Sequence, residues 1–368
     1  MRILEKFTIR NFKSIREQTL TLDQLNVFIG GNGAGKSNLV QAFRLLREIQ
    51  AQNLAAYSLE RGADSLMYFG RKVSKSMDFE LVFSETGLSN SYHVWLMPTD
   101  EGSLTIDQET IAFHNRTKFA SPRETLINSG SRESRLATNT DGVSAYVRRD
   151  LSTYRVYHFH DTSDSAPVKS AGPIDDNRDL RSDASNLAAF LYMLQQRNPD
   201  NFRNIEDSIR QIAPFFGRFN LEPSRLTPDR IRLEWQENGS DAYFNAASLS
   251  DGTLRFMCLA TLLQQPRLPA VILLDEPELG LHPAAIALLA GLLSAASMRT
   301  QVIVATQSVT LVNQFAPEHI CIVDREDRQS VFKRLDQSEL QVWLNEYGGH
   351  EGYGLGELWE KNLLGARP

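Results

Sequence analysis

Residues 30–37 read Gly30-Gly31-Asn32-Gly33-Ala34-Gly35-Lys36-Ser37, which is the G-x-x-x-x-G-K-[ST] pattern of a phosphate-binding loop. The preceding run Leu25–Ile29 is mostly apolar and predicts a short buried strand. After the loop, apolar residues recur at the spacing of one helical face: Leu39, Val40, Phe43, Leu46 and Ile49. Because strand, loop and helix follow in the order that the motif requires, a phosphate loop is favoured over a chance glycine-rich turn.

The residue types in this loop suit a bound triphosphate. Glycines let backbone N–H groups turn inward without the clash of a Cβ atom. Together with the positive end of the following helix, those N–H groups form a nest for phosphate oxygens. Lys36 has the length to reach the β- and γ-phosphates, and the Ser37 hydroxyl can join the coordination shell of Mg²⁺. The sequence therefore predicts ATP and Mg²⁺ as cofactors.

The 368-residue chain has the composition of an ordinary globular protein, with 42% hydrophobic and 23% charged residues and a formal net charge of −6. No apolar run approaches the length of a membrane span, and the alternating N-terminus is unlike a signal peptide, so we expect no membrane partner. The two cysteines, Cys258 and Cys321, argue against a disulfide framework or zinc site and for a cytoplasmic location. A DNA contact would need a local basic patch or the assembled oligomer.

A second apolar run, Ala270–Leu274, ends in two carboxylates, Asp275 and Glu276. Its continuous hydrophobicity predicts a central parallel strand that is buried on both faces. Carboxylates after such a strand lie at the sheet edge where α/β proteins bind ligands, and the phosphate loop is expected at the same edge. Asp275 would orient water on the Mg²⁺ beside Ser37, and Glu276 would serve as general base or positioning group for the attacking water. The alternative is an acidic helix cap after a core strand.

The segments on either side of these carboxylates extend the pattern. Ser250-Asp251-Gly252 precedes an apolar helical stretch and predicts a helix N-cap, either with anion-binding character or as a cap alone. Pro283 stands at a good first helical position for a helix over 283–298. A strand over 300–306 follows and ends at Gln307, so the order predicts a βαβ unit with a right-handed crossover. The helix is expected to bury one apolar face: Ala285, Ile286, Leu289, Leu292 and Leu293.

Taken together, these segments resemble the ATP-binding-cassette heads of the RecF, structural-maintenance-of-chromosomes (SMC) and OLD-type ATPases over nearly the whole chain. The opening segment Phe7–Ser14 resembles their first strand and turn. About 240 residues separate the phosphate loop from the carboxylates, far more than a single βαβ unit of roughly 30. The most specific resemblance is to a stand-alone bacterial group of predicted AAA-family ATPases. It is carried by Tyr157–Ser163, LSDGTLRF at 249–256, DEPELGLHP at 275–283, ATQS at 305–308 and Leu355–Asn362.

The resemblance implies an α/β fold: a P-loop NTPase of the ABC-ATPase head type, with a mostly parallel core sheet, an antiparallel β layer and a helical lobe. It implies a homodimer that forms on ATP binding, in which Ser250 and Gly252 of one protomer close over the γ-phosphate held by the other. It also implies that the nucleotide site extends beyond the loop to four further residues: Arg10, Asn11, Lys13 and Asn38.

The sequence departs from the cassette pattern at four places, one of which is Thr253 in place of the usual glutamine. Asp251 replaces the usual first signature glycine, and we expect its side chain to point away from the phosphate and cap the helix. Gln307 occupies the position of the switch histidine; because glutamine cannot become cationic, it argues against fast hydrolysis but not against ATP binding. His282 stands where many cassettes carry an aspartate, and it is interpreted as a helix cap, with pH-sensitive closure as the alternative.

Residues 155–161 are interpreted as the loop that joins the lobes, in the form of an alternating strand that ends in polar groups. Its order in the chain favours a Mg²⁺-linked or interlobe role, with Asp161 as a further candidate metal ligand. His158, His160 and Asp161 also form an H-x-H-D pattern, so a dedicated metal cluster is one alternative and a plain strand end is the other.

The remaining segments predict a division into an N-terminal ATPase lobe (1–162), a linker with a helical lobe (163–246) and a C-terminal ATPase lobe (247–368). Residues 76–115 predict antiparallel strands, clearest at Met77–Phe83 and Tyr92–Met97. The Arg-rich segment 116–150 is interpreted as a solvated mobile loop, with a DNA- or partner-contacting patch as the alternative. Residues 163–182 are interpreted as a linker and 183–216 as helical.

These features favour a Mg²⁺-dependent ATPase whose head dimerisation acts as a switch in DNA repair or anti-phage defence, together with a separate effector such as a nuclease or toxin. The acidic residues Asp324, Glu326 and Asp327 are assigned to a hairpin turn, and no nuclease is expected within the chain. The alternatives are a slow or non-hydrolysing ATP sensor that regulates a partner protein and, less favoured, the motor subunit of a transporter.

Overall fold

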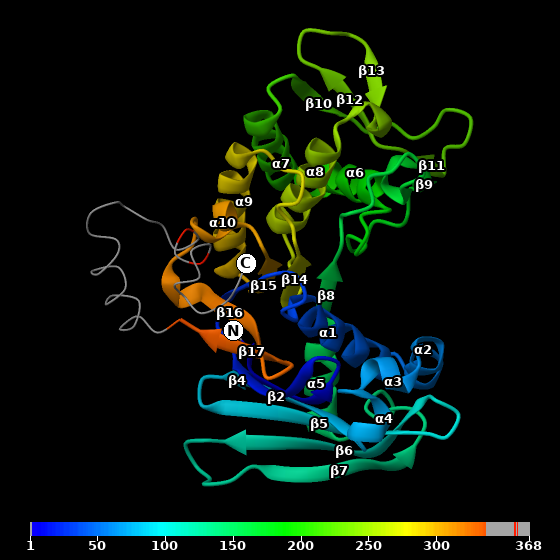
Figure 1. Cartoon of the computed structure of the whole chain (residues 1–368). Coiled ribbons are helices and arrows are strands. Elements are labelled where there is room, and N and C mark those ends of the chain that lie inside the picture. The colour runs from blue at the N-terminus through cyan, green and yellow to red at the C-terminus, as the bar shows by residue number, and fades with distance from the viewer. Residues whose placement is uncertain (1, 336–356, 358, 360–368) are drawn as a thin grey trace. The chain divides into compact units, whose positions relative to one another are not determined.

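The computed structural model describes residues 2–335 together with Glu357 and Trp359, so most of the segment Leu355–Asn362 lies outside the described residues. The chain divides into two compact units, coloured by residue number in Figure 1. Unit 1 comprises Met1–Tyr154, Ala305–Val312 and Ala316–Pro368, and unit 2 comprises Arg155–Val304 and Asn313–Phe315. The three-way division expected from the sequence stays a prediction. Within the described part of the chain, no helix has both the length and the apolar character needed to cross a membrane.

Unit 1 contains a six-stranded antiparallel sheet with the strand order β2-β1-β4-β5-β6-β7. The antiparallel layer expected from the alternation of residues 76–115 is confirmed. Its strands are β1 (Ile3–Phe12), β2 (Ile15–Thr21), β4 (Met77–Glu85), β5 (Leu88–Pro98), β6 (Leu104–Asn115) and β7 (Arg123–Ser131).

Aromatic side chains join this sheet to the helix that follows the phosphate loop. Helices α1 (Lys36–Gln50) and α5 (Gly142–Ser152) lie over one face of the sheet (Figure 1). The Phe7 ring of β1 lies 4.8 Å from the Phe43 ring of α1, and both are almost fully buried. The five apolar residues predicted for the inner face of α1 are all buried, since the amphipathic face packs into this core. Shorter helices follow: α2 (Leu54–Arg61), α3 (Ala63–Leu66) and α4 (Gly70–Val73).

A smaller set of strands in unit 1 carries the phosphate loop. Strand β3 (Leu25–Ile29) is buried at every position, as its apolar run predicts. It pairs in parallel with β16 (Ile320–Glu326), which pairs in antiparallel with β17 (Gln329–Arg334). The acidic segment 324–327 therefore belongs to a hairpin, as expected. The short elements α10 (Val309–Val312) and η3 (Pro317–His319) precede this hairpin.

The interpretation of residues 116–150 as a mobile loop is wrong, because this segment contains β7 and α5. Two kinds of contact that the number of charges does not reveal explain why this segment is structured. Val147 and Leu151 are buried on α5, and Arg148 donates hydrogen bonds to the carbonyls of Leu136 and Ala137. Arg116 pairs with Glu5, so several of the arginines stabilise the fold.

Unit 2 contains the helical lobe and the strands that precede the carboxylate pair. Helix α8 packs against both α7 and α9, and β14 lies between β8 and β15. The helical prediction for 183–216 and the strand and helix predictions for 270–306 are confirmed. The main elements are β8 (Tyr154–Tyr157), α6 (Leu187–Arg197), α7 (Pro199–Ile212), α8 (Asp251–Gln264), β14 (Val271–Asp275), α9 (Pro283–Ser297) and β15 (Gln301–Thr306). A small antiparallel sheet adds β10 (Phe216–Asn220), β12 (Glu234–Glu237) and β13 (Tyr243–Asn245).

Two local expectations in unit 2 are wrong. Residues 163–182 do not form a free linker, because Val168 and Leu180 are buried and β9 (Gly172–Pro173) pairs with β11 (Arg230–Ile231). Leu292 is only half-buried, whereas the other four apolar residues predicted for the inner face of α9 are buried. The 3₁₀ turns of this unit are η1 (Pro167–Lys169) and η2 (Ala246–Ser248).

Candidate nucleotide site

The phosphate loop forms a compact turn between β3 and α1. Gly33 has a φ of +80° and Gly35 a φ of +123°, which are conformations that side-chain-bearing residues rarely adopt. Helix α1 begins at Lys36 with no side-chain cap and no acidic residue in its first turn, so the positive end of its dipole is not neutralised locally. The Ser37 side chain next to this end is exposed.

Lys36 is folded into the loop rather than extended into solvent. Its exposure is only 5%, and Nζ donates hydrogen bonds to the carbonyls of Gly30 at 2.6 Å and Gly31 at 3.0 Å. A buried ammonium is stable only where acceptors or anions surround it. The loop thus holds a cation at its centre, and the arrangement fits the phosphate groups of a nucleotide.

The loop packs tightly on the β16–β17 hairpin, and this packing explains two of its glycines. A Cβ atom on Gly30 would lie 2.2 Å from the carbonyl oxygen of Val323, and one on Gly35 would lie 2.0 Å from Ser330 Oγ. Gly33 has open space around it, so its positive φ alone favours glycine there. The sequence predicts both the loop and the hairpin but not their contact, since the two are about 300 residues apart.

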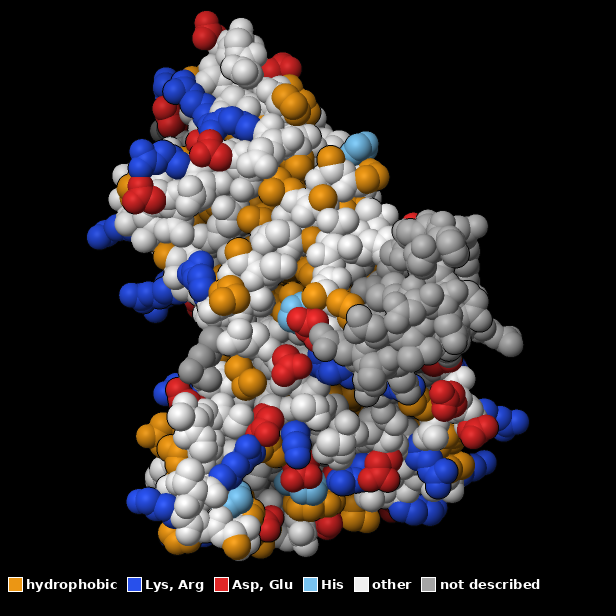
Figure 2. Space-filling model, turned by 90° about the vertical axis from the view of Figure 1, so that its left-hand side faces the viewer, with side chains coloured by type: hydrophobic (Ala, Val, Ile, Leu, Met, Phe, Trp, Pro, Cys, Tyr) orange, Lys and Arg blue, Asp and Glu red, His pale blue; other side chains and the backbone are white. Residues whose placement is uncertain are grey.

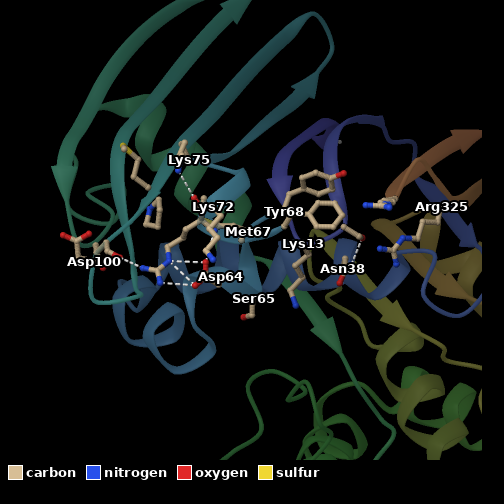
Figure 3. Close-up of a pocket in the computed structure, with 18 residues that line it drawn as sticks. Lys13, Asn38, Asp64, Ser65, Met67, Tyr68, Lys72, Lys75, Asp100 and Arg325 are labelled. Carbon is tan, nitrogen blue, oxygen red and sulfur yellow. Dashed lines mark hydrogen bonds and ion pairs between the residues drawn. The ribbon is translucent and has the colours of Figure 1, made fainter.

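A cavity of about 1140 Å³ opens beside the loop within unit 1 (Figure 3). Lys13 and Asn38 lie at the end of the cavity next to the start of α1, and Lys72 lies toward the antiparallel sheet. Burial lowers the pKa of Lys13, with a smaller contribution from the charge of Arg61. The exposed Phe69 ring also lines the cavity. The cavity therefore offers both cations and an aromatic face to a ligand. The other basic residues of the lining are Arg71, Lys75, Arg325 and Arg328.

Arg10 and Asn11 are engaged within the protein. Arg10 donates to Asp78 at 2.7 Å and to Glu17 at 2.9 Å across the sheet. Asn11, at a φ of +56°, donates its amide to the carbonyl of Ser76 at 3.0 Å. These contacts hold the turn that carries Lys13 to the cavity, so the direct nucleotide contact expected of Arg10 and Asn11 stays a prediction.

In unit 2, the carboxylate pair follows β14 as expected. Asp275 is the last residue of the strand and is half-buried. Glu276 has a φ of +44°, a strained conformation for a residue with a side chain. Such strain concentrates at functional sites, where the surrounding structure enforces it.

The helix that follows Ser250 is tied to the segment after β8. Ser250 is the N-cap of α8 and accepts from the Thr253 N–H, while Asp251 begins the helix; the cap expected of Asp251 is thus made by its neighbour. Arg255, only 6% exposed, donates to the carbonyls of Phe159 at 3.0 Å and His160 at 3.3 Å. Arg255 was missed by the sequence analysis, although it is the one charged residue in the apolar run Leu254–Leu263.

His160 connects this segment to the carboxylate strand. Its Nε2 donates to the backbone carbonyl of Asp275 at 2.9 Å, since a carbonyl can only accept. The strand itself ends at Tyr157, earlier than expected, and Asp161 is exposed and accepts from the N–H and hydroxyl of Ser163. In the described ranges, no three His, Cys, Asp or Glu side chains gather as a metal cluster would require.

Two further predicted positions have clear local roles. His282 caps α9, with its ring nitrogen accepting from the Ala284 N–H, which agrees with its interpretation as a cap. Gln307 directly follows β15 in unit 1 and is half-buried. The buried thiols offer no reactive group, because burial raises the pKa of Cys258 and of Cys321 to about 12.

The predicted site residues therefore form two groups. Unit 1 holds the phosphate loop, Lys13, Asn38 and Gln307, and unit 2 holds Asp275 with Glu276, Ser250 with Gly252, and His160.

Comparisons with known proteins identify the family and the fold. A family model described as "AAA domain, putative AbiEii toxin, Type IV TA system" matches residues 25–313. The chain belongs to this AAA family. No curated protein matches the chain.

Solved SMC heads share the fold. A crystal structure of the SMC head bound to the C-terminal winged-helix domain of ScpA has a TM-score of 0.61 at 17% identity, over 92% of this chain and 99% of that one. An SMC head with an extended coiled coil, bound to the C-terminal domain of ScpA from Pyrococcus furiosus, has a TM-score of 0.58 at 15% identity, over 94% and 99%. This AAA family member therefore has the α/β fold of an SMC-head P-loop ATPase.

Proposed function

We propose that the chain binds Mg²⁺-ATP at residues 30–37 and hydrolyses it with Asp275 and Glu276. The observation that carries the proposal is the phosphate loop itself. Gly33 and Gly35 adopt positive φ, the lysine of the loop is buried within it, and α1 begins directly at its end. A cavity with Lys13 and Asn38 continues from the loop and has room for a nucleoside.

Each residue has a role that its chemistry allows. Lys36 exchanges its bonds to the loop carbonyls for the β- and γ-phosphates. Ser37 and Asp275 would hold Mg²⁺, Asp275 partly through water, and the ion would neutralise developing charge on the phosphates. Glu276 positions the attacking water or accepts its proton, and its strained backbone fixes the carboxylate relative to the end of β14. Gln307 hydrogen-bonds water or phosphate without adding charge, so we expect slow hydrolysis.

ATP-driven dimerisation completes the proposal. Ser250 and Gly252 begin a helix whose N–H groups suit an anion, and in the resembling cassette heads this segment serves the opposite protomer's nucleotide. We therefore propose a homodimer closed by two ATP molecules.

The proposed partner is a separate protein. Two SMC heads with this fold were crystallised with a domain of ScpA, and this supports a protein as the partner of a head of this type. On the face shown in Figure 2, basic and acidic side chains are interspersed, and the net charge is −6. We therefore place an effector such as a nuclease or toxin ahead of DNA as partner, in a repair or defence setting.

The test is a set of three proteins measured for Mg²⁺-ATP binding, phosphate release and oligomeric state. Wild type should bind ATP and release phosphate slowly. Lys36→Ala should lose binding by at least about 100-fold, since it removes the charge at the centre of the loop. Glu276→Gln should keep binding, lose most phosphate release and accumulate as an ATP-dependent dimer.

Two outcomes have distinct meanings. A Glu276→Gln variant that releases phosphate at the wild-type rate would contradict the assignment of Glu276. A wild type that binds and dimerises on ATP without releasing phosphate would favour the second candidate, an ATP sensor, which the glutamine at position 307 supports.

A further inference from the structure

Three segments far apart in the sequence meet at the phosphate loop through a chain of hydrogen bonds, all within unit 1. Asn38 Nδ2 lies 2.6 Å from Ser14 Oγ, and Ser14 Oγ lies 2.6 Å from Ser330 Oγ. Ser330 Oγ in turn donates to the carbonyl oxygen of Ala34, a residue of the loop. The backbone N–H of Ser330 also donates to the carbonyl of Ser14 at 2.7 Å.

The chemistry of these groups gives the chain one direction. The Ala34 carbonyl can only accept, so Ser330 uses its single proton there and must accept from Ser14. Ser14 has then donated its own proton, and it accepts from the amide of Asn38, which has protons to give. Each of the two hydroxyls thus accepts from one neighbour and donates to the next, and hydrogen bonds aligned in this way strengthen one another.

This chain orients one peptide group of the phosphate loop. The Ala34 carbonyl is held toward the hairpin, and the peptide that joins Ala34 to Gly35 is trans. In a planar trans peptide the C=O and N–H bonds point to opposite sides, so the Gly35 N–H is directed away from the hairpin. Ser330 is fully buried and lies against Gly35.

We propose that Ser330 and Ser14 are positioning residues of the phosphate nest. They hold the Ala34–Gly35 peptide in the orientation that lets the Gly35 N–H serve the nucleotide phosphates. The inference rests on the proposed nucleotide binding and extends it to the β16–β17 hairpin, which lies outside every phosphate-loop motif in the sequence.

The test measures the affinity for AMP-PNP with Mg²⁺ by calorimetry, and the unfolding temperature without nucleotide. Ser330→Ala should weaken binding about tenfold, since a buried carbonyl loses its donor and the loop peptide its restraint. Ser14→Ala should weaken it less, because Ser330 can still donate to Ala34. Ser14→Thr keeps the hydroxyl and should bind like wild type.

A matched control comes from the same unit. Thr8 and Thr19 form another hydroxyl pair, 3.1 Å apart between β1 and β2, and Thr8 is buried. Thr8→Val should lower the unfolding temperature about as much as Ser330→Ala but leave the AMP-PNP affinity unchanged.

The outcomes separate this inference from the proposal on which it rests. If Ser330→Ala binds AMP-PNP like wild type while Lys36→Ala does not, the positioning role is wrong and nucleotide binding stands. If Thr8→Val loses as much affinity as Ser330→Ala, the effect is general destabilisation and the positioning role is again overturned. If wild type itself does not bind AMP-PNP, nucleotide binding is wrong.

Discussion

At Gly35 two separate constraints meet, and each excludes a side chain for its own reason. The φ of +123° is unfavourable for any residue with a Cβ, and the place of that Cβ is taken by Ser330. Gly33 has the first constraint alone, with a φ of +80° and open space around it. The pair therefore allows conformational strain to be separated from steric exclusion.

Gly35→Ala should be far more damaging than Gly33→Ala. We expect Gly33→Ala to lower the free energy of unfolding by about 1 kcal/mol, the usual cost of a left-handed residue. Gly35→Ala adds a clash with the hairpin and should cost about 3 kcal/mol or more, with loss of nucleotide binding. Chemical denaturation of both variants measures these losses. Equal losses in the free energy of unfolding would mean that the hairpin can move away from a Cβ atom at position 35 at little cost.

Asp78 provides a residue-scale prediction for pH. Burial alone would raise its pKa, but hydrogen bonds from His93 and Arg10 outweigh burial and hold the pKa below the ordinary 3.8. A carboxylate with a lowered native pKa stabilises the fold above its ordinary pKa, and this contribution is lost as the pH falls through the native pKa. Asp78→Asn should therefore lower the free energy of unfolding by about 1–2 kcal/mol at pH 7.

The Asp78→Asn difference should shrink as the pH falls below 3.8, the ordinary value. Denaturation of both proteins at a series of pH values measures it. A difference in the free energy of unfolding that stays constant across the acid range would show that the stabilisation by Asp78 does not depend on its charge.

At the scale of elements, sequence patterns predicted those helices and strands that are determined by residues close together in the sequence. The strand before the phosphate loop and the helix after it were predicted because their apolar spacing is continuous in sequence. Contacts between distant segments left no such pattern. Ser14 and Ser330 are 316 positions apart, and neither residue type is unusual for a turn or strand end.

The Arg-rich segment 116–150 shows the same limit. Its charges are typical of a solvated loop, but Glu109 of β6 organises it from within the sheet. This fully buried carboxylate accepts from Tyr92 at 2.7 Å, Asn128 at 3.0 Å and the Arg135 N–H at 2.9 Å, and also from the Ser134 hydroxyl. The segment after β7 is thus held by a residue that precedes it by about 25 positions.

Replacement of Glu109 should therefore destabilise β7 and the segment after it, and not only remove single hydrogen bonds. Glu109→Leu leaves several buried donors without an acceptor and should lower the free energy of unfolding by about 3 kcal/mol. Hydrogen exchange should rise in β7 and in residues 133–136 before it rises elsewhere. Exchange that rises evenly over the whole sheet would contradict this role for Glu109.

At the scale of the whole molecule, the fold class was predictable because the two nucleotide motifs, the switch strand and the antiparallel layer occur in the order of a known head. The family match and the SMC-head fold bear this out. The joint site was not derivable in the same way. The phosphate loop belongs to unit 1 and the carboxylate pair to unit 2, so the proposal that they form one site rests on the order of the two motifs in the resembling heads.

The central claim is that residues 30–37 and Asp275 hold one metal–nucleotide complex. Fe²⁺ can replace Mg²⁺ among oxygen ligands, and with ascorbate and peroxide it cleaves the backbone beside its site. With ATP present, the account predicts two cleavages in one protein, one next to Ser37 and one next to Asp275, both absent from Lys36→Ala. Cleavage beside only one of the two segments, or cleavage that does not depend on ATP, would contradict it.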